Sequence, residues 1–495
     1  MLKFQDDLPV DEQIDCDGRF LTPAFVDGHI HATGTGFSIL GLDLSSARDQ
    51  RQAISMIAQF CHEQPYDEVL TGFGWDESVW PQNAAPSKAD LDRACGGRQF
   101  YASRVDAHSG LVSSALWDRV AGVAEAIGAP PDADSAHARL SAFNLVHQYA
   151  TAAVSDRQRR RMQIAALHRA RQNGIAMVVE MAGPTISSER DLRALLTLAQ
   201  EPGMPLVQAY WGELGAIDLV IELGLAGAGG DLFCDGAIGS HTAALAQPYA
   251  DSRPDQPEHG HLWLSREQVA QHVQLCTRAG IQAGFHAIGD RAIRAVIDGI
   301  ADVAGELGDS AVRRLQHRIE HCEMVDATGI ATMARLGIIA SVQPMFDRAW
   351  GGRTALYEQR LGERSTTLNP IADLLAAGVH VAFSSDAPVT PLAPWSSVHS
   401  AIHHHTVQQR ISPQAAFSAM TVAGWRAIDG QLHAGELREG APAHLALWDC
   451  ERLNTQSRPY GLPEGVTEDS AECTAPVCML TVVAGQVAYR ALSLS

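Results

Sequence analysis

Two histidines, His29 and His31, give the strongest local signal for chemistry in this sequence, in the stretch FVDGHIH. If this stretch is a β-strand, residues two positions apart point to the same face, and both imidazoles project together. Two neutral imidazoles on one face are a good start for a divalent-metal site, with Zn²⁺ as the first expectation. Taken alone, the pair can equally be two histidines exposed by chance.

Three further residues stand where predicted strands end: His286 in GFHAIGD, His321 in RIEHCE and Asp386 in FSSDAP. Each is followed by residues typical of a loop or of the start of a helix. One histidine in such a place is more often packed or solvated. Four histidines and an aspartate, all at strand ends, are hard to explain structurally, and we predict that they converge as metal ligands.

The residue types suit one kind of chemistry. Imidazole nitrogens and a carboxylate are ligands for a borderline divalent ion. Such an ion lowers the pKa of bound water toward ~7, which makes hydroxide available at neutral pH. Asp386 can accept the proton of that water and pass it to a leaving nitrogen, which is general acid–base catalysis. A metal ion or a nearby donor polarises the scissile carbonyl.

Eight apolar, β-branched stretches are candidates for the strands that position these residues. They are 25–31, 175–180, 205–211, 231–235, 281–286, 315–321, 337–342 and 380–386. Helical patterns separate most of them, for example 156–173, which ends at Gly174. This alternation predicts an α/β fold, a closed (β/α)8 barrel of the TIM type, with the site at the C-terminal ends of its strands.

The chain has 495 residues, more than the ~250 of a bare barrel. We predict a metal-dependent barrel formed by residues 23–63 and 151–429, with an inserted subdomain at its mouth over residues 64–150. The stretches HLALWDC and MLTVVAGQVAYR look like short antiparallel strands. Residues 430–495 and 1–22 are therefore predicted to form a small β-sandwich outside the barrel.

Composition limits the class of protein. Hydrophobic residues make up 46% and charged residues 19%, an ordinary globular balance. The formal net charge of −20 disfavours nucleic acid and anionic membrane surfaces as partners. The acidic start MLKFQDDLPVDEQ does not resemble a signal peptide, and no apolar run of ~18 residues predicts a membrane span. With nine cysteines and no CxxC pair, we expect reduced thiols and a cytoplasmic protein.

Several motifs together resemble the amidohydrolase superfamily, specifically the amidohydrolase-3 (YtcJ-like) branch that includes N-substituted formamide deformylase. They are LTPAFVDGHIHA, GFGWDES, SRVDAHSGLVSSAL, LFCDGAIGSHTAAL, FHAIGDRAI, RIEHCEMV, SVQPMF, FSSDAPV and GELREGAPAHLALWD. The resemblance implies metal ligands at His29, His31, His286, His321 and Asp386. It also implies hydrolysis of a carbon–nitrogen bond in an amide, formamide or related non-peptide substrate.

One position departs from the family pattern. Many members carry a carboxylated lysine at the fourth strand, where it bridges two metal ions, and the equivalent residue here is Asp231. We expect an aspartate to be too short to copy that lysine. Glu180, at the end of the second strand, is a candidate substitute bridge, although a loop-anchoring role is equally open. The missing lysine favours one ion, or two ions with an unusual bridge.

The resemblance also indicates residues that could contact substrate. It implies that Arg104 and His108 face the substrate, while a structural salt bridge within the insertion is the alternative. His241 follows an Asp-Gly turn and is a further candidate. Trp75 belongs to a group of aromatic residues near the predicted mouth, and Gln343 follows the seventh strand directly, where it would line the pocket.

Three functions remain open. The first is hydrolysis of an amide-type substrate, which makes a small molecule the expected partner and leaves homo-oligomerisation open. The second is a mononuclear deaminase of the same superfamily, but such enzymes resemble one another in a glutamate where this chain has Gly289. The third is a catalytically degenerate barrel that binds a ligand. The complete set of predicted metal ligands disfavours it, because a scaffold needs no water-activating ion.

Overall fold

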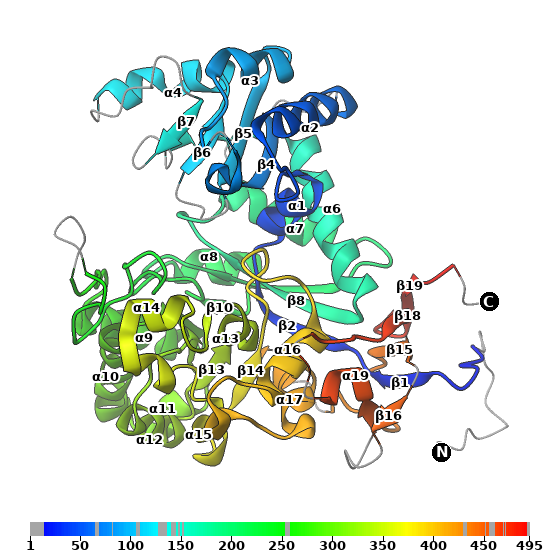
Figure 1. Ribbon diagram of the computed structural model, residues 1–495. Coiled ribbons are helices and arrows are strands. Elements are labelled where there is room, and N and C mark those ends of the chain that lie inside the picture. Colours follow the sequence, from blue (N-terminus) through cyan, green and yellow to red (C-terminus); the bar gives the residue numbers. More distant parts are fainter. Residues whose placement is uncertain are drawn as a thin grey trace.

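The architecture is taken from a computed structural model, and Figure 1 shows its ribbon. The described residues are 14–64, 69–81, 83–104, 109–126, 136–139, 145–146, 149–150, 153–252, 258–428, 433–450, 452–454, 461–468, 470 and 472–492.

An eight-stranded parallel sheet forms the centre of the molecule, in the order β14-β13-β12-β11-β10-β9-β8-β2. Its strands are β2 (Phe25–Ile30), β8 (Ile175–Ala182), β9 (Leu206–Trp211), β10 (Gly227–Ala228), β11 (Gln282–Ala287), β12 (Arg318–His321), β13 (Ile339–Val342) and β14 (Val381–Phe383). Every residue of β2 and β8 is buried, as expected for parallel strands covered on both faces. The predicted barrel is confirmed.

The barrel closes where β2 meets the segment that follows β14. The backbone N–H of Asp386 donates to the carbonyl oxygen of His29 at 2.9 Å, and that of His31 donates to Ala387 at 2.8 Å. The closing hydrogen bonds therefore involve the same residues that were predicted as metal ligands, and they fix the first and last strand ends against each other.

Helices surround the barrel, packing against its strands and against one another (Figure 1). They include α6 (Asp156–Gln172), α7 (Glu189–Leu198), α8 (Ile217–Leu223), α9 (Arg266–Ala279), α10 (Asp290–Leu307), α11 (Asp309–Arg313), α12 (Ala327–Leu336), α13 (Pro344–Trp350), α15 (Ile371–Ala376), α16 (Pro394–Ile402), α17 (Pro413–Ala419) and α18 (Val422–Ile428). In α10, Ile293, Val296, Ile297 and Ile300 lie at helical spacing and are buried. Among the described residues, we find no helix with the length and hydropathy to cross a lipid bilayer.

The fourth strand differs from the prediction. It was expected at residues 231–235, but β10 spans Gly227–Ala228. Two glycines with positive φ, Gly229 (+106°) and Gly230 (+72°), then end the strand. A Cβ at Gly229 would lie 1.9 Å from the carbonyl oxygen of Gly284, so only glycine fits this close approach to β11. Asp231 therefore lies past the end of the strand rather than at its start.

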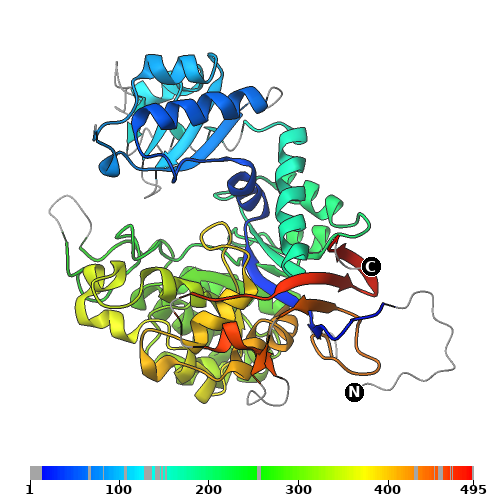
Figure 2. The ribbon, with the colours of Figure 1, turned by 45° about the vertical axis from the view of Figure 1, so that its right-hand side comes forward.

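A second, five-stranded sheet with its own helices forms a separate lobe beside the barrel (Figures 1 and 2). It contains β3 (Leu42–Asp43), β4 (Val69–Trp75), β5 (Gln99–Arg104), β6 (Ser109–Val112) and β7 (His137–Arg139), together with α2 (Gln50–Glu63), α3 (Lys88–Ala94) and α4 (Ser114–Ala126). Its first strand lies before residue 64, where we predicted the insertion to begin. The domain boundaries at 64 and 150 stay a prediction.

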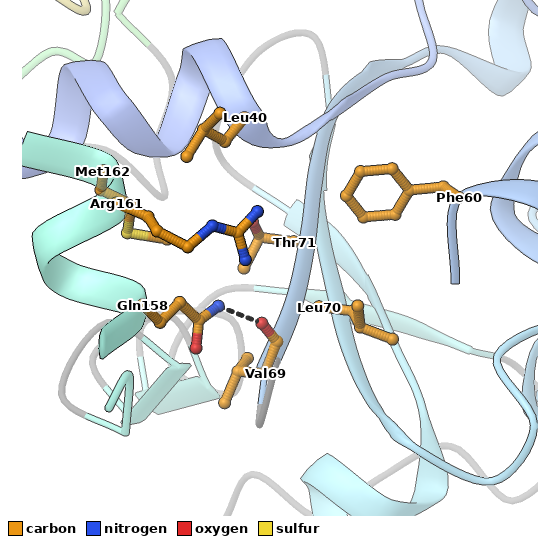
Figure 3. Close-up of a pocket in the computed structure, with 8 residues that line it drawn as sticks. All are labelled: Leu40, Phe60, Val69, Leu70, Thr71, Gln158, Arg161 and Met162. Atoms are coloured by element: carbon orange, nitrogen blue, oxygen red, sulfur yellow. Dashed lines mark hydrogen bonds between the residues drawn. The ribbon is translucent and has the colours of Figure 1, made fainter. Parts of the chain in front are cut away.

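Helices α1 (Ala32–Leu40) and α6 join the two lobes. A Cβ at Gly36 would lie 1.9 Å from the carbonyl oxygen of Met162, so the two helices touch backbone to backbone. The side-chain amide of Gln158 donates to the carbonyl oxygen of Val69 at 2.6 Å, which ties α6 to β4 (Figure 3). Helix α1 begins immediately after His31, and this junction therefore lies close to the predicted site.

The two ends of the chain meet in a four-stranded antiparallel sheet, in the order β1-β15-β18-β19. Its strands are β1 (Phe20–Pro23), β15 (Leu445–Asp449), β18 (Val477–Val483) and β19 (Gln486–Arg490). Trp448 packs its ring 5.4 Å from Trp395 and 5.7 Å from Phe25, so this sheet shares a core with the barrel. The sandwich boundaries at residues 22 and 430 stay a prediction.

Candidate metal centre

Asp231 lies at the centre of the four predicted histidine ligands. Its Oδ2 is 3.3 Å from Nε2 of His29 and 3.2 Å from Nε2 of His31. Its Oδ1 is 3.4 Å from Nδ1 of His286 and 3.7 Å from Nε2 of His321. The carboxylate of Asp231 therefore reaches all four histidines, which differs from the short reach expected from the sequence. The reason is that the chain leaves β10 early and carries Asp231 itself over the strand ends.

Asp386 completes the group from the segment after β14. Its Oδ1 lies 3.4 Å from Nε2 of His29 and 3.2 Å from Nε2 of His31. The backbone of Asp386 has φ +54° and that of His321 has φ +69°, a left-handed conformation that is uncommon outside glycine. Asp27 anchors this segment by accepting from the backbone N–H of Ser385 at 2.9 Å, and burial raises the pKa of Asp27 to about 6.

His29 is held by a buried carboxylate on the far side of its ring. Its Nδ1 lies 3.0 Å from Oε2 of Glu320. Glu320 is in turn paired with Arg318, which donates to the same oxygen at 3.0 Å. Because a carboxylate only accepts hydrogen bonds, Nδ1 of His29 carries the proton and Nε2 presents its lone pair to Asp231.

The other three rings follow the same pattern, each with an acceptor on its outer nitrogen. The pairs are Nδ1 of His31 with Met181 O (3.1 Å), Nδ1 of His321 with Gln343 Oε1 (2.9 Å) and Nε2 of His286 with Gly236 O (3.3 Å). Each outer nitrogen therefore donates to a carbonyl oxygen, and in the neutral ring each inner nitrogen is left with a lone pair. All four lone pairs face the carboxylates of Asp231 and Asp386.

With the four rings neutral, the inner atoms would have no hydrogen-bond donor between them. Within the described chain, the buried atoms without a hydrogen-bond partner include His29 Nε2, His286 Nδ1, His321 Nε2, Asp231 Oδ1 and Asp386 Oδ1. Buried acceptors that face one another are costly unless a cation lies between them. Five ligand atoms of the types that bind borderline divalent ions therefore fit a metal centre.

The electrostatics of the two histidines on β2 support the same conclusion. Burial alone lowers the pKa of an imidazole. Here the carboxylates of Asp231 and Asp386 outweigh burial and raise the pKa of His29 well above its ordinary value, and that of His31 to about 10. Without a cation the inner nitrogens of His29 and His31 therefore take up protons, and a bound metal ion would displace these protons, because a ligating imidazole is neutral.

Glu180, predicted as a possible bridge between metal ions, is not placed as one. Its Oε2 accepts a hydrogen bond from the backbone N–H of Ala32 at 2.6 Å and so caps the start of α1. Burial raises the pKa of its carboxyl to about 7. Among the described residues, the groups of ligand atoms close enough to share an ion do not include Glu180. The structure thus places it in the loop-anchoring role that was the alternative.

Gln343, predicted to line the pocket, holds the ring of His321, one of the candidate metal ligands. Its Oε1 accepts from Nδ1 of His321, and its Nε2 donates to Oγ of Ser384 at 2.9 Å, which fixes the orientation of the amide. The ring of Phe346 stacks parallel to that of His321, 6.0 Å away. Both contacts hold the His321 ring.

Two residues predicted to contact substrate belong to the second lobe. Trp75 is fully buried in the core of that lobe, and its Nε1 donates to the carbonyl oxygen of Ala102 at 3.1 Å. Arg104 pairs with Asp76 at 2.7 Å and with Glu77 at 2.8 Å, the structural ion pair named as its alternative. Contact of Trp75 or Arg104 with substrate stays a prediction.

The other two candidates are His241 and His108. His241 has φ +57°, and its Nε2 lies 2.9 Å from Oδ1 of Asp251, in the loop after β10. His108 lies outside the described residues. Contact of either residue with substrate stays a prediction.

The buried pair of Arg318 and Glu320 was missed from the sequence. The two residues stand two positions apart in RIEH, so they point to the same face of β12. Both side chains are fully buried inside the barrel. Charged residues with strand spacing in a stretch that must be buried were the signal that could have revealed them.

The chain is similar to known proteins along most of its length. A sequence model of the family described as "Amidohydrolase family" matches residues 12–489. The putative amidohydrolase YtcJ of Bacillus subtilis is 25% identical, and the match spans 97% of this chain and 91% of that protein. The N-substituted formamide deformylase of Arthrobacter pascens is 23% identical, over 90% of this chain and 86% of that protein.

Solved structures share the fold. An uncharacterized metal-dependent hydrolase from Pyrococcus horikoshii OT3 superposes with a TM-score of 0.72 at 22% identity, over 88% of this chain and 87% of that chain. At this identity the likeness concerns the fold.

Proposed function

Because this chain belongs to the amidohydrolase family, we propose that it is a metal-dependent hydrolase of a carbon–nitrogen bond in a non-peptide amide, with N-substituted formamides as the first class to test. The observation that carries the proposal is the convergence of four imidazole lone pairs on the carboxylates of Asp231 and Asp386. The reaction consumes water and an amide, and releases a carboxylic acid and an amine.

We further propose that the centre holds two divalent ions with Asp231 as the bridge. One ion would be held by His29, His31, Asp231 Oδ2 and Asp386, and the other by His286, His321 and Asp231 Oδ1. Within each of the groups His29–His31–Asp231 and Asp231–His286–His321, the ligand atoms lie within 4.8 Å of one another. A carboxylate whose two oxygens face different histidine pairs suits a bridging role, and Zn²⁺ is the ion that we propose first.

Asp386 is the proposed general acid and base. A bound divalent ion lowers the pKa of water and so supplies a nucleophile at neutral pH. Burial raises the pKa of a carboxyl, but the neighbouring His29 and His31 keep the pKa of Asp386 below its ordinary value. The carboxylate is therefore ionised at neutral pH. It accepts the proton of the attacking water and then delivers it to the nitrogen that leaves.

A deaminase fits this backbone less well. The glutamate that such enzymes of the superfamily share would have to replace Gly289. A Cβ at this position would lie 2.2 Å from the carbonyl oxygen of Ala244, so the loop leaves no room for a side chain. We therefore favour hydrolysis of an amide over removal of an amino group from a heterocycle.

The proposal is tested by assaying metal-loaded protein against a panel of N-substituted formamides, acetamides and amino-heterocycles. We expect an amine and a carboxylic acid to be released in equal amounts from members of the first two groups. Release of ammonia from the heterocycles alone would favour the deaminase. Protein that is fully loaded with metal and releases neither product would support the ligand-binding barrel.

A further inference from the structure

A cavity of about 770 Å³ lies between the barrel and the second lobe. On the barrel side it is lined by His31 and Glu180, and on the lobe side by Phe73 of β4 and Tyr101 of β5. Its volume falls in the range of small-molecule sites. Since His31 belongs both to this cavity and to the candidate metal centre, a molecule in the cavity would extend directly from the reacting atoms.

The walls of the cavity combine apolar and polar residues. The apolar residues that line it include Phe37, Phe73, Tyr101, Met162, Ile186 and Pro388. They come from both lobes and from the helices that join them. Hydroxyl side chains line the cavity as well, namely those of Thr33, Ser38, Ser103, Thr185, Ser187 and Ser188. Walls of this kind suit an aromatic or aliphatic group that also carries polar atoms.

Two of the charged residues in the lining already neutralise each other. Arg159 pairs through Nε with Asp191 at 2.9 Å and through a terminal nitrogen with Asp156 at 2.5 Å. Asp191 also accepts from Oγ1 of Thr33, at 2.9 Å and 3.0 Å to its two oxygens. The positive charge of Arg159 is therefore matched by two carboxylates and does not favour an anionic ligand.

Glu180 is a carboxylate in the lining that can accept further hydrogen bonds. The residue is 2% exposed. Among the described residues, the backbone N–H of Ala32 is the one group that donates a hydrogen bond to it. Burial raises the pKa of this carboxyl to about 7, so above that pH it is ionised and offers about four acceptor positions. A buried carboxylate with unfilled acceptor capacity, facing a cavity, suits a hydrogen-bond donor and repels an anion.

We propose, building on the hydrolase function above, that this cavity binds the part of the substrate beyond the scissile bond. That part is an apolar group carrying an N–H or ammonium donor, and Glu180 accepts the hydrogen bond from it. Glu180 thereby selects donor-bearing substrates and rejects those that carry a carboxylate at the same place.

The test uses three phenyl hydroxamates that share one metal-binding group and differ in the para substituent: methyl, aminomethyl or carboxylate. Their affinities for the metal-loaded protein are measured at about pH 8, above the pKa of Glu180, by calorimetry, which requires no turnover. We expect the aminomethyl compound to bind at least about tenfold more tightly than the carboxylate compound. Equal affinities, or a preference for the carboxylate, would overturn the proposal, and this result does not depend on the folding of any variant.

The variant Glu180→Gln keeps an oxygen for Ala32 and removes the charge. We expect it to bring the two affinities within about threefold of each other while the metal content stays that of the wild type. The control Glu189→Gln, an exposed residue paired with Arg193 on α7, should keep the wild-type preference. An unchanged preference in Glu180→Gln, or loss of metal from it, would overturn the role of Glu180.

The same measurement separates this inference from the function on which it rests. Failure of all three hydroxamates to bind would contradict the metal centre and the inference together. Tight binding of all three without a preference would overturn the recognition by Glu180 alone and leave the hydrolase function intact.

Discussion

The carboxylate of Glu320 lies 3.0 Å from Nδ1 of His29, on the opposite side of the ring from Asp231. Arg318 pairs with both oxygens of this carboxylate and also donates to the carbonyl oxygen of Gly28 at 3.0 Å. Burial would raise the pKa of Glu320, but Arg318 and His29 lower it to about 2. The His29 ring is thus fixed in one tautomer by an ionised group inside the barrel.

Replacing Glu320 with glutamine should weaken metal binding by about 10- to 100-fold, the usual effect of losing the partner of a ligating histidine. It should also destabilise the protein by about 3 kcal/mol, because Arg318 would be left as a buried charge without its counter-ion. Metal content after dialysis against a chelator and urea unfolding measure the two effects. Glu222→Gln, an exposed partner of Arg193, is the control. Unchanged metal affinity would exclude the positioning role of Glu320.

Asp231→Asn tests the bridge. An amide has one oxygen to offer where the carboxylate has two, so it cannot serve both histidine pairs equally. We expect the metal content, measured by mass spectrometry, to fall from two ions per chain to one or none, with activity reduced at least about 100-fold. Asp302→Asn, at an exposed position paired with Arg266, should leave both unchanged. Two firmly held ions in Asp231→Asn would contradict the bridge.

Asp386→Asn tests the proton transfer. Asparagine keeps an oxygen next to His29 and His31 but cannot accept a proton at neutral pH. We expect the rate constant for turnover to fall by about 10²- to 10⁴-fold while the ion content stays that of the wild type. Steady-state kinetics and metal analysis on the same preparation separate the two roles. A variant that loses its ions and its activity together would show that Asp386 is needed chiefly as a ligand.

Removal of the ions should lower stability as well as activity. A ligand that binds the folded chain and not the unfolded one stabilises the fold in proportion to the logarithm of its concentration over its dissociation constant. We therefore expect a chelator to lower the thermal midpoint, and Zn²⁺ or another divalent ion to restore it together with hydrolysis. An identical midpoint and identical activity before and after complete chelation would contradict a resident metal centre.

The sequence was sufficient to predict where most of the candidate ligands lie in the fold. His286 and His321 stand at the ends of apolar stretches that could be recognised as strands, and the ends of parallel barrel strands converge. Asp231 was harder to place, because β10 is two residues long and consists of Gly227 and Ala228, which carry no strand pattern. The strand was predicted a few residues too late in the sequence, and this changed the reach expected for the carboxylate of Asp231.

Side-chain directions in the second lobe could not be predicted in the same way. Trp75 follows a bend at Gly74, which has φ +80°, and the register between β4 and β5 shifts at this point. Whether an aromatic residue there faces the cavity or the core depends on that shift, which leaves no mark in the hydrophobic pattern. Phe73, two residues earlier, lines the cavity, while Trp75 is buried.

A buried histidine outside the metal centre gives a prediction about pH and stability. His317 is fully buried, its Nδ1 accepts from the backbone N–H of Ala283 at 2.9 Å, and its Nε2 lies 3.1 Å from Oγ1 of Thr277. Because Nδ1 already accepts a hydrogen bond, it has no room for a proton. Burial and the nearby His272 lower the pKa of His317 to about 3.

The sign of the effect follows from which state binds the proton. In the unfolded chain this imidazole takes up a proton below its ordinary pKa of 6.5, whereas in the folded protein it stays neutral until about 3. The stability that it contributes is therefore complete above pH 6.5 and is lost as the pH falls from 6.5 toward 3, at about 1.4 kcal/mol per pH unit.

His317→Asn keeps an acceptor for Ala283 but does not titrate. Between pH 7.5 and 5.0, its free energy of unfolding should fall by about 2 kcal/mol less than that of the wild type. The exposed His62→Asn should show the full wild-type loss, and an equal loss in His317→Asn would mean that this histidine is not the acid-sensitive group.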